Sequence, residues 1–108
     1  MAKVTLDGEK IRGWESFHDE CQHAFGFPEF YGRNMNAWVD CLSYLRDEDG
    51  MSKFRLEPDE VLQIEVIHTE SLRIRAPDIL EDMEFCISAI NERYEDYGEK
   101  PALELVLI

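Results

Sequence analysis

The middle of the chain reads Val61-Leu62-Gln63-Ile64-Glu65-Val66-Ile67, a stretch rich in β-branched residues in which apolar and polar side chains partly alternate. Both features favour a β-strand, because branched side chains pack well on a pleated surface and alternation places them on one face. This is the strongest strand pattern in the sequence. The segments on either side of it therefore decide which kind of sheet the strand joins.

A long helix and another strand are expected after it. Pro77 suits the first position of a helix, because the N–H that proline lacks would have no hydrogen-bond partner within the helix there. Apolar residues then recur at helical spacing as far as Gly98, which favours a helix end; they are Leu80, Met83, Ile87, Ile90 and Tyr94. From Ala102 to Ile108 the chain is almost continuously apolar, as in parallel strands covered by helices. The stretch from Thr69 to Ala76 fits either a connector or a turn of helix.

A short strand and two helices are expected before it. Val4 to Leu6 predicts the strand, which the turn-forming pair Asp7-Gly8 closes. Apolar side chains at helical spacing predict one helix from Gly13 to Phe25. Asn34 can cap a second helix that runs from Met35 to about Leu45.

The order of strands and helices predicts a small α/β domain with a three-stranded, mainly parallel sheet covered by helices. The 108 residues suffice for one hydrophobic core and not for two ordinary domains, so we expect a single domain over residues 1–108. Between the second helix and the central strand, residues Arg46 to Glu60 are rich in acids, include Gly50 and Pro58, and show no periodicity. They predict an exposed loop.

The chain carries 24 acidic and 11 basic residues, a formal net charge of −13, and the acids are spread along its length. Charge of this size costs stability through self-repulsion, and solubility needs less of it. A soluble acidic cytosolic protein is the plainest interpretation. The charge argues against binding nucleic acid, because phosphate contacts need a basic patch. It favours a basic partner, and the substrate groove of a nuclease is one such surface.

Three features bear on the compartment. Cys21, Cys41 and Cys86 are odd in number and widely spaced, so we expect no disulfide framework. The chain turns polar within a few residues of Met1, which predicts no signal peptide, and it contains no apolar run long enough to span a membrane. These features predict a cytoplasmic protein that does not bind a membrane.

The sequence shows no pattern typical of an enzyme: we find no nucleophile with a base, no paired acid and base, and no phosphate-binding glycine loop at recognisable spacing. His68 follows the central strand, where α/β proteins often bind ligands, but this placement alone predicts little. His18, Cys21 and His23 fit no closed zinc pattern, and Cys21 belongs to an apolar helix face. We therefore expect no catalysis, no metal and no cofactor.

The second helix carries the functional prediction. At about 100° per residue, one arc of this helix is apolar and holds Met35, Trp38, Val39, Cys41, Leu42 and Leu45. The opposite stripe holds Asn36, Asp40, Ser43 and Tyr44. Asp40 is therefore expected to point outward from the middle of a polar helix face, where an acid is most often simply solvated.

The loop before this helix carries a motif that indicates a protein family. It contains Pro28-Glu29-Phe30-Tyr31-Gly32 followed by Asn34, and the helix contains Asp40-Cys41-Leu42. This combination resembles the barstar family, in which an aromatic-Tyr-Gly-x-Asn loop leads into a helix with an Asp-Cys pair. The resemblance extends upstream to Val4, and downstream it is a similarity of element order, with a longer charged loop in the middle.

The resemblance implies an intracellular protein that binds a basic, barnase-like ribonuclease or a related toxin in a one-to-one complex and blocks its active site. Asp40 occupies the position of the family's central acid and would mimic an RNA phosphate before the Arg, Lys and His side chains of the cleft. Tyr31 would act as a rigid aromatic anchor. The predicted partner-binding residues are Phe30, Tyr31, Gly32, Asn34, Asn36, Asp40 and Ser43.

Three departures from the family pattern bear on the target. Phe30 replaces the first of two adjacent tyrosines, Asn36 replaces an acid, and Val39 replaces a tryptophan just before the central Asp. They leave open an alternative, in which a protein of the same fold is an immunity protein, antitoxin or regulator for a different basic toxin or partner.

The last helix of the family contributes further acids to the inhibitory surface. Here Arg93 and Tyr97 lie near the corresponding places. The neighbouring acids are Glu92, Glu95 and Asp96. They stay outside the primary predicted site, and their part in an interface stays open.

Overall fold

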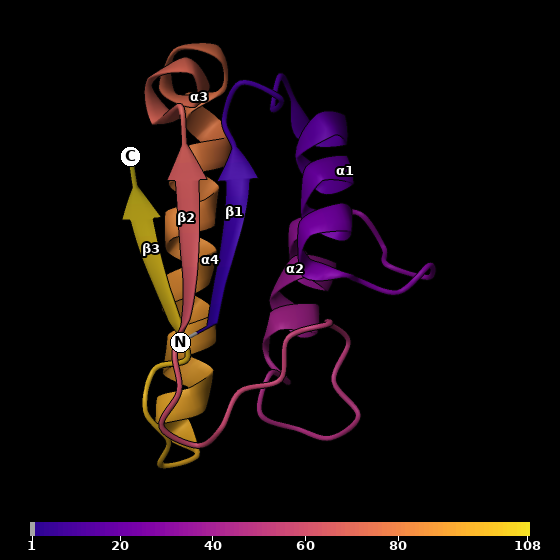
Figure 1. Cartoon of the computed structure of the whole chain (residues 1–108), viewed down its shortest axis with the longest axis vertical. Helices are drawn as coiled ribbons and strands as arrows, with labels where there is room; N and C mark the ends of the chain where they lie inside the picture. The colour runs from indigo at the N-terminus through magenta and orange to yellow at the C-terminus, as the bar shows by residue number, and fades with distance from the viewer. Residues whose placement is uncertain (1) are drawn as a thin grey trace.

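The computed structural model describes residues 2–108 as one layer of strands backed by helices (Figure 1). The strands are β1 (Ala2–Asp7), β2 (Leu62–Ile67) and β3 (Leu103–Leu107). The helices are α1 (Trp14–Phe25), α2 (Met35–Leu42), α3 (Thr69–Arg75) and α4 (Pro77–Asp96). Every predicted strand and helix is present, and the ambiguous stretch after β2 forms the helix α3.

β2 lies in the middle of the sheet, between β1 and β3, and both pairs are parallel. Ile64 lies opposite Val4 on one side and opposite Leu105 on the other. Parallel neighbours need a long connection, and helices supply it, because α1 and α2 follow β1 while α3 and α4 follow β2. The predicted α/β fold is confirmed, with a sheet that is parallel throughout the described residues.

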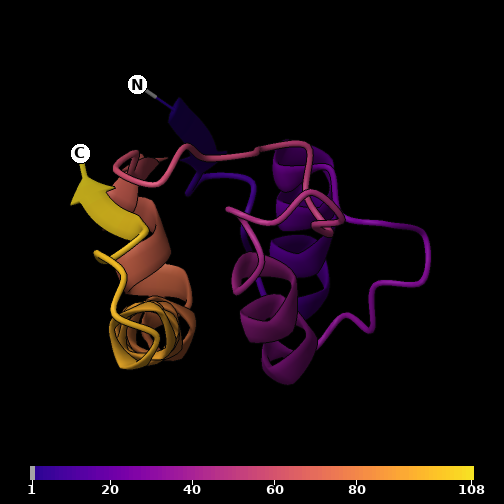
Figure 2. The same cartoon turned by 90° about the horizontal axis from the view of Figure 1, so that it is seen from below.

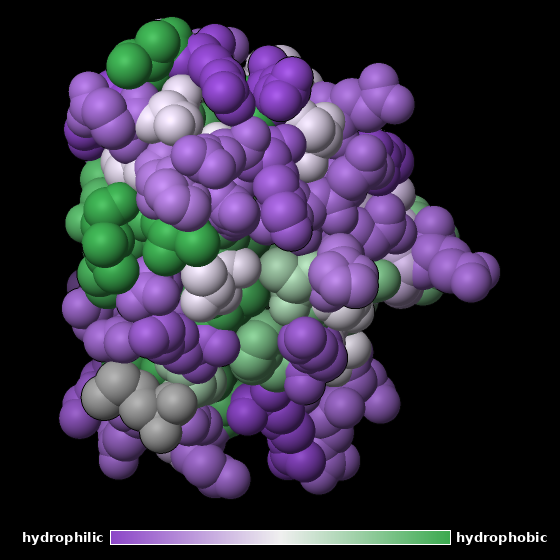
Figure 3. Space-filling view, turned by 45° about the horizontal axis from the view of Figure 1, so that its top comes forward, coloured by the Kyte–Doolittle hydropathy of each residue, from purple (hydrophilic) through white to green (hydrophobic). Residues whose placement is uncertain are grey.

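The helices cover one face of the sheet (Figure 2). Apolar side chains of β2 face them and have no exposed area: Leu62, Ile64 and Val66. On the other face, Glu65 forms an ion pair with Lys3 at 3.1 Å. The prediction that helices cover the apolar strand β3 therefore holds for one face only. Because β3 is an edge strand, its Leu107 stays 38% exposed, and Figure 3 shows an apolar area within the mostly polar surface of the domain.

The helix ends show where local chemistry and tertiary packing act. α1 stops before Gly26, whose φ of 68° is the left-handed conformation that glycine adopts readily. Pro77 is the first residue of α4, as predicted. α2 ends at Leu42, earlier than the predicted Leu45. The chain turns there because the buried N–H of Leu45 donates to the hydroxyl oxygen of Tyr94 at 2.9 Å.

The acid-rich loop between α2 and β2 is only partly exposed, which corrects the prediction. Leu56 is 3% exposed, and its N–H donates to the carbonyl of Leu45 at 2.7 Å. The N–H of Lys53 donates to the carbonyl of Phe25, at the end of α1, at 2.9 Å. A few apolar residues thus draw the loop onto the core, although its composition is polar.

The cysteines are buried and unpaired, as expected: Cys21, Cys41 and Cys86. Burial raises the pKa of each thiol, so all three are protonated at neutral pH. Among residues 2–108, no helix combines the length and the apolar composition that crossing a bilayer requires.

Candidate protein-binding site

α2 presents Asp40 to solvent, as its periodicity predicts. The helix begins after Asn34, whose side-chain oxygen accepts the N–H of Ala37 at 2.8 Å and so caps the first turn. Trp38 and Leu42 lie on the inner side of α2 with no exposed area and attach it to the core. The side chain of Asp40 is consequently held on the outside, where it is 60% exposed.

Arg93 of α4 lies beside Asp40. Its Nη1 donates to Oδ1 of Asp40 at 3.3 Å and to Oγ of Ser43 at 3.1 Å. The hydroxyl of Ser43 donates to the carbonyl of Val39 at 2.6 Å, so its oxygen is free to accept from the guanidinium. Asp40 and Arg93 are 53 positions apart in the chain. The packing of α2 against α4 therefore joins an acid and a base that no local pattern connects.

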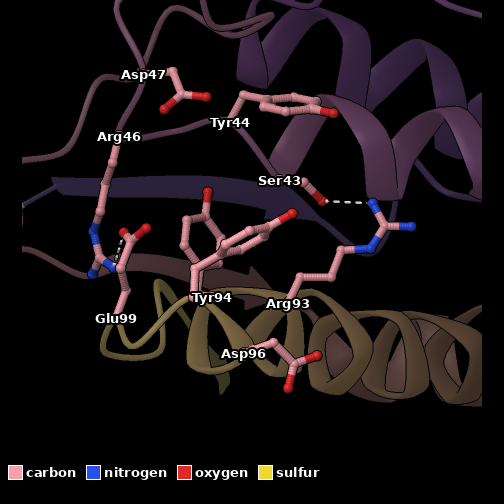
Figure 4. Close-up of a pocket in the computed structure, with 9 residues that line it drawn as sticks. Ser43, Tyr44, Arg46, Asp47, Arg93, Tyr94, Asp96 and Glu99 are labelled. Atoms are coloured by element: carbon pink, nitrogen blue, oxygen red, sulfur yellow. Dashed lines mark hydrogen bonds and ion pairs between the residues drawn. The ribbon is translucent and has the colours of Figure 1, made fainter.

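Two hollows flank this ion pair between α2 and α4. The first is lined by Met35, Asn36, Val39, Asp40, Phe85, Cys86, Ala89 and Arg93. The second is lined by Ser43, Tyr44, Arg46, Asp47, Arg93, Tyr94, Asp96, Tyr97 and Glu99 (Figure 4). Arg93 lines both hollows and so lies near the centre of this surface. We call Asp40, Ser43, Arg93 and the two hollows the α2–α4 face.

Large exposed side chains border the α2–α4 face. Phe85 is 74% exposed beside the first hollow, and Tyr97 is 85% exposed beside the second. Arg46, in contrast, is tied into the fold, because its guanidinium donates to the carbonyls of Lys100 and Glu60. Of the two arginines that line the second hollow, Arg93 is therefore the one available to a partner.

Tyr31 lies in the core. It is 5% exposed, and its hydroxyl oxygen is 2.6 Å from Nδ1 of the buried His18. Its ring packs on Phe27 with the centroids 4.7 Å apart. Burial raises the pKa of Tyr31 and lowers the pKa of His18, so both groups are neutral at pH 7. This position differs from the predicted surface anchor, because the loop folds its tyrosine back against α1.

The loop between α1 and α2 projects from the domain (Figures 1 and 2). Arg33 holds it to α1 by bonds to the side chains of Asp19 at 2.7 Å and Gln22 at 3.2 Å. Phe30 lies in this loop and is 77% exposed. The exposed aromatic side chain of the loop is therefore Phe30, and not Tyr31.

The remaining predicted site residues form two groups. The first comprises Asn36 and Asp40 on the outer side of α2, with Ser43 at the C-cap of the helix. The second is exposed in the preceding loop and comprises Phe30, Gly32 and Asn34. Arg93 was missing from the predicted site. Its spacing from Gly98 placed it near the acids of the last helix, but only the packing of α4 puts it beside Asp40.

Among residues 2–108, one group places possible metal-ligand atoms within 4.8 Å of one another: Asp7, Glu9 and His68. Nδ1 of His68 lies 2.9 Å from Oδ1 of Asp7. This hydrogen bond raises the pKa of His68 and lowers the pKa of Asp7. Both shifts favour the charged forms of the two groups, and the hydrogen bond joins the ends of β1 and β2.

Comparison with known proteins agrees with this architecture. The sequence profile of the barstar family, described as Barstar (barnase inhibitor), matches residues 1–106. A protein of Bacillus subtilis (strain 168), named "Putative ribonuclease inhibitor YrdF", is 40% identical over 43 residues, which are 40% of this chain and 47% of that protein. The matched part thus spans about half the length of that relative. Because the family profile covers almost the whole chain, this protein belongs to the barstar family.

Proposed function

We propose that this protein inhibits a basic ribonuclease in a one-to-one complex, by covering the active site of the ribonuclease with the α2–α4 face and the loop before α2. The description of the family as barnase inhibitor supports the class of target. The observation that carries the proposal is the outward position of Asp40, 60% exposed in the middle of α2.

Asp40 supplies the chemistry of inhibition. A ribonuclease must hold the phosphates of RNA with cationic side chains, and a carboxylate accepts the same hydrogen bonds as a phosphate oxygen. An Arg of the cleft can bind both carboxylate oxygens in a fork, which adds geometric specificity. The rigid cap and the buried inner side of α2 fix the position of Asp40 before binding, so little ordering cost remains.

The charge of the whole chain assists the encounter. A formal net charge of −13 creates a negative field that attracts a basic cleft and raises the association rate. The same field repels RNA, so the inhibitor does not bind the substrate of its target.

Residues around Asp40 complete the surface. Asn36, on the outer side of α2, offers hydrogen-bonding groups beside the carboxylate. Ser43, at the C-cap of α2, offers the remaining acceptor capacity of its oxygen, because its hydroxyl donates to the carbonyl of Val39 and accepts from Arg93. Phe30 supplies an exposed aromatic contact from the loop. Asn34 acts mainly within the chain, because its side chain caps α2 and also donates to the carbonyl of Gly32 at 3.3 Å.

Titration of the purified protein into barnase and other basic ribonucleases, with RNA cleavage as the readout, tests the proposal. Activity is expected to fall linearly and to vanish at one equivalent for the cognate ribonuclease. Asp40→Asn keeps the shape of the side chain and removes its charge, so it is the matched variant. Unchanged cleavage by every ribonuclease in the presence of excess protein would contradict the proposal.

A second candidate function is immunity against a different basic toxin. The position of Arg93 favours it, because a cation at 3.3 Å from Asp40 changes the charge that the face presents. The partner that co-purifies from the native cell is released from the complex and assayed for nuclease activity, which separates the two functions. Nuclease activity of the released partner supports the first function, and a released toxin without nuclease activity supports the second.

A further inference from the structure

We infer that Arg93 selects the partner: the surface that binds the α2–α4 face presents a carboxylate to Arg93 next to the cation that it presents to Asp40. This inference rests on the proposed function and specifies the chemistry of the target. A cleft that presents only cations would complement the charge of Asp40 but would leave Arg93 without a partner of opposite charge. The geometry around Arg93 points to a target with adjacent charges of both signs.

The two charges cannot be covered separately. Nη1 of Arg93 lies 3.3 Å from Oδ1 of Asp40, and their side chains are 50% and 60% exposed. A partner that closes over Asp40 therefore also removes water from Arg93. Within residues 2–108, every hydrogen bond of the Arg93 guanidinium is made by Nη1, to Asp40 and Ser43. Its Nε and Nη2 donors consequently depend on water until a partner replaces it.

The charge balance requires an acid from the partner. Asp40 and Arg93 together are neutral, so a single cation from the partner leaves one uncompensated positive charge in a site from which water is excluded. Burying an uncompensated charge is strongly unfavourable. A carboxylate that accepts from Nε and Nη2 of Arg93 restores neutrality and satisfies both donors in a bidentate pair.

Within the described part of the chain, Asp40 is the one acid that forms an ion pair with Arg93. Asp96, which follows Arg93 by one helical turn and lines the same hollow, forms no ion pair with Arg93 among the described residues, and Figure 4 shows its carboxylate away from the guanidinium. Glu99 is occupied by Arg46 at 3.3 Å. Tyr44 and Tyr97 border the hollow and are 43% and 85% exposed. They leave the approach to Arg93 open to a side chain of the partner.

Substitution of Arg93 tests the inference with the ribonuclease that the unaltered protein inhibits, beginning with barnase. Arg93→Gln is expected to weaken inhibition at least about tenfold, and Arg93→Lys, which keeps the charge but not the fork, less. The matched control is Arg73→Gln in α3, because Arg73 is similarly exposed at 52% and pairs with Glu70 at 3.3 Å. It makes the same change in net charge and is expected to alter inhibition no more than about twofold. Unchanged or tighter inhibition by Arg93→Gln would overturn the inference, because it would show that Arg93 only repels the cleft.

Double-mutant cycles identify the carboxylate of the ribonuclease that binds Arg93. They also distinguish this contact from a role of Arg93 that is limited to positioning Asp40. Each acidic residue in the ribonuclease cleft is changed to its amide and paired with Arg93→Gln. One carboxylate is expected to account for the effect, so that its loss makes Arg93→Gln neutral. An equal loss with every cleft variant would mean that Arg93 only orients Asp40, and would overturn the inference while the proposed function stands. Failure of the unaltered protein to inhibit any ribonuclease would overturn both.

Discussion

The hydroxyl oxygen of Tyr31 lies 2.6 Å from Nδ1 of His18, inside the core and 13 positions away in the chain. This bond ties the loop before α2 to the middle of α1. It gives Tyr31 a structural part in the site, since it fixes the loop that carries Phe30. The exposed aromatic and the buried aromatic of the loop are thus adjacent residues, Phe30 and Tyr31.

Tyr31→Phe is expected to lower the free energy of unfolding by about 1 to 3 kcal/mol, because it leaves a buried nitrogen of His18 without a partner. Urea denaturation measures this loss. Inhibition at a temperature well below the transition should stay within about twofold of the unaltered protein. Phe30→Ala is the matched comparison, with stability within about 0.5 kcal/mol and weakened inhibition. A Tyr31→Phe variant that folds as stably as the parent but no longer inhibits would place Tyr31 in the interface.

Asp40→Asn should weaken inhibition at least about a hundredfold, equivalent to about 2.7 kcal/mol, because it removes one partner of a charge pair buried in the complex; the barnase–barstar complex is itself the reference case for losses of this kind. The free energy of unfolding should change by less than about 1 kcal/mol, since the bond to Arg93 is exposed. Asp59→Asn in the loop before β2 is the control, with the same chemical change at a side chain 84% exposed. Equal effects of the two variants on inhibition would remove α2 from the binding surface.

The ion pair of Asp7 and His68 should stabilise the fold most between about pH 4 and pH 6.5, near the ordinary pKa values of 3.8 and 6.5 for the two groups. The hydrogen bond raises the pKa of His68, so its contribution is complete below pH 6.5 and is lost as pH rises through the folded value. It lowers the pKa of Asp7, whose contribution is complete above pH 3.8 and is lost as pH falls through the folded value.

His68→Asn isolates this term, because Asn tolerates the left-handed backbone that His68 adopts at φ 54°. The urea midpoints of the parent and the variant are compared at about pH 5.5 and about pH 8.5. The stability difference between parent and variant should be larger at the lower pH. A difference that is the same at both values would show that the pair does not titrate with folding.

The association rate with the target should fall at least about tenfold between about 20 mM and about 500 mM salt, because the field of the whole acidic chain is screened. Stopped-flow mixing measures it. Asp40→Asn should keep almost the same salt dependence, because it removes one charge of a formal net −13, and should mainly speed dissociation. A salt-independent association rate would mean that the acidic surface does not guide the encounter.

Much of the fold was predictable because it follows from local rules. Pro77 begins α4 because the proline ring favours the first position of a helix. Gly26 follows the end of α1 because a residue without a Cβ adopts the left-handed conformation readily. Both effects depend on a single residue. The expected helices between successive strands made a parallel sheet predictable from the sequence, because parallel strands need long connections. Two predictions were wrong because groups far apart in the chain form hydrogen bonds. The end of α2 differs where the N–H of Leu45 donates to the hydroxyl oxygen of Tyr94. The loop before β2 is partly buried where the N–H of Leu56 donates to the carbonyl of Leu45.

By itself, the sequence determined that Asp40 faces outward, because the period of a helix turns the alternation of apolar and polar residues into an inner and an outer side. Only the tertiary structure decided what surrounds that carboxylate. Arg93 reaches it, and Tyr31 leaves the surface, through packing between segments that are far apart in the chain. Backbone geometry sets which way a side chain points along one helix, whereas contact between two helices depends on how all of their buried faces fit together.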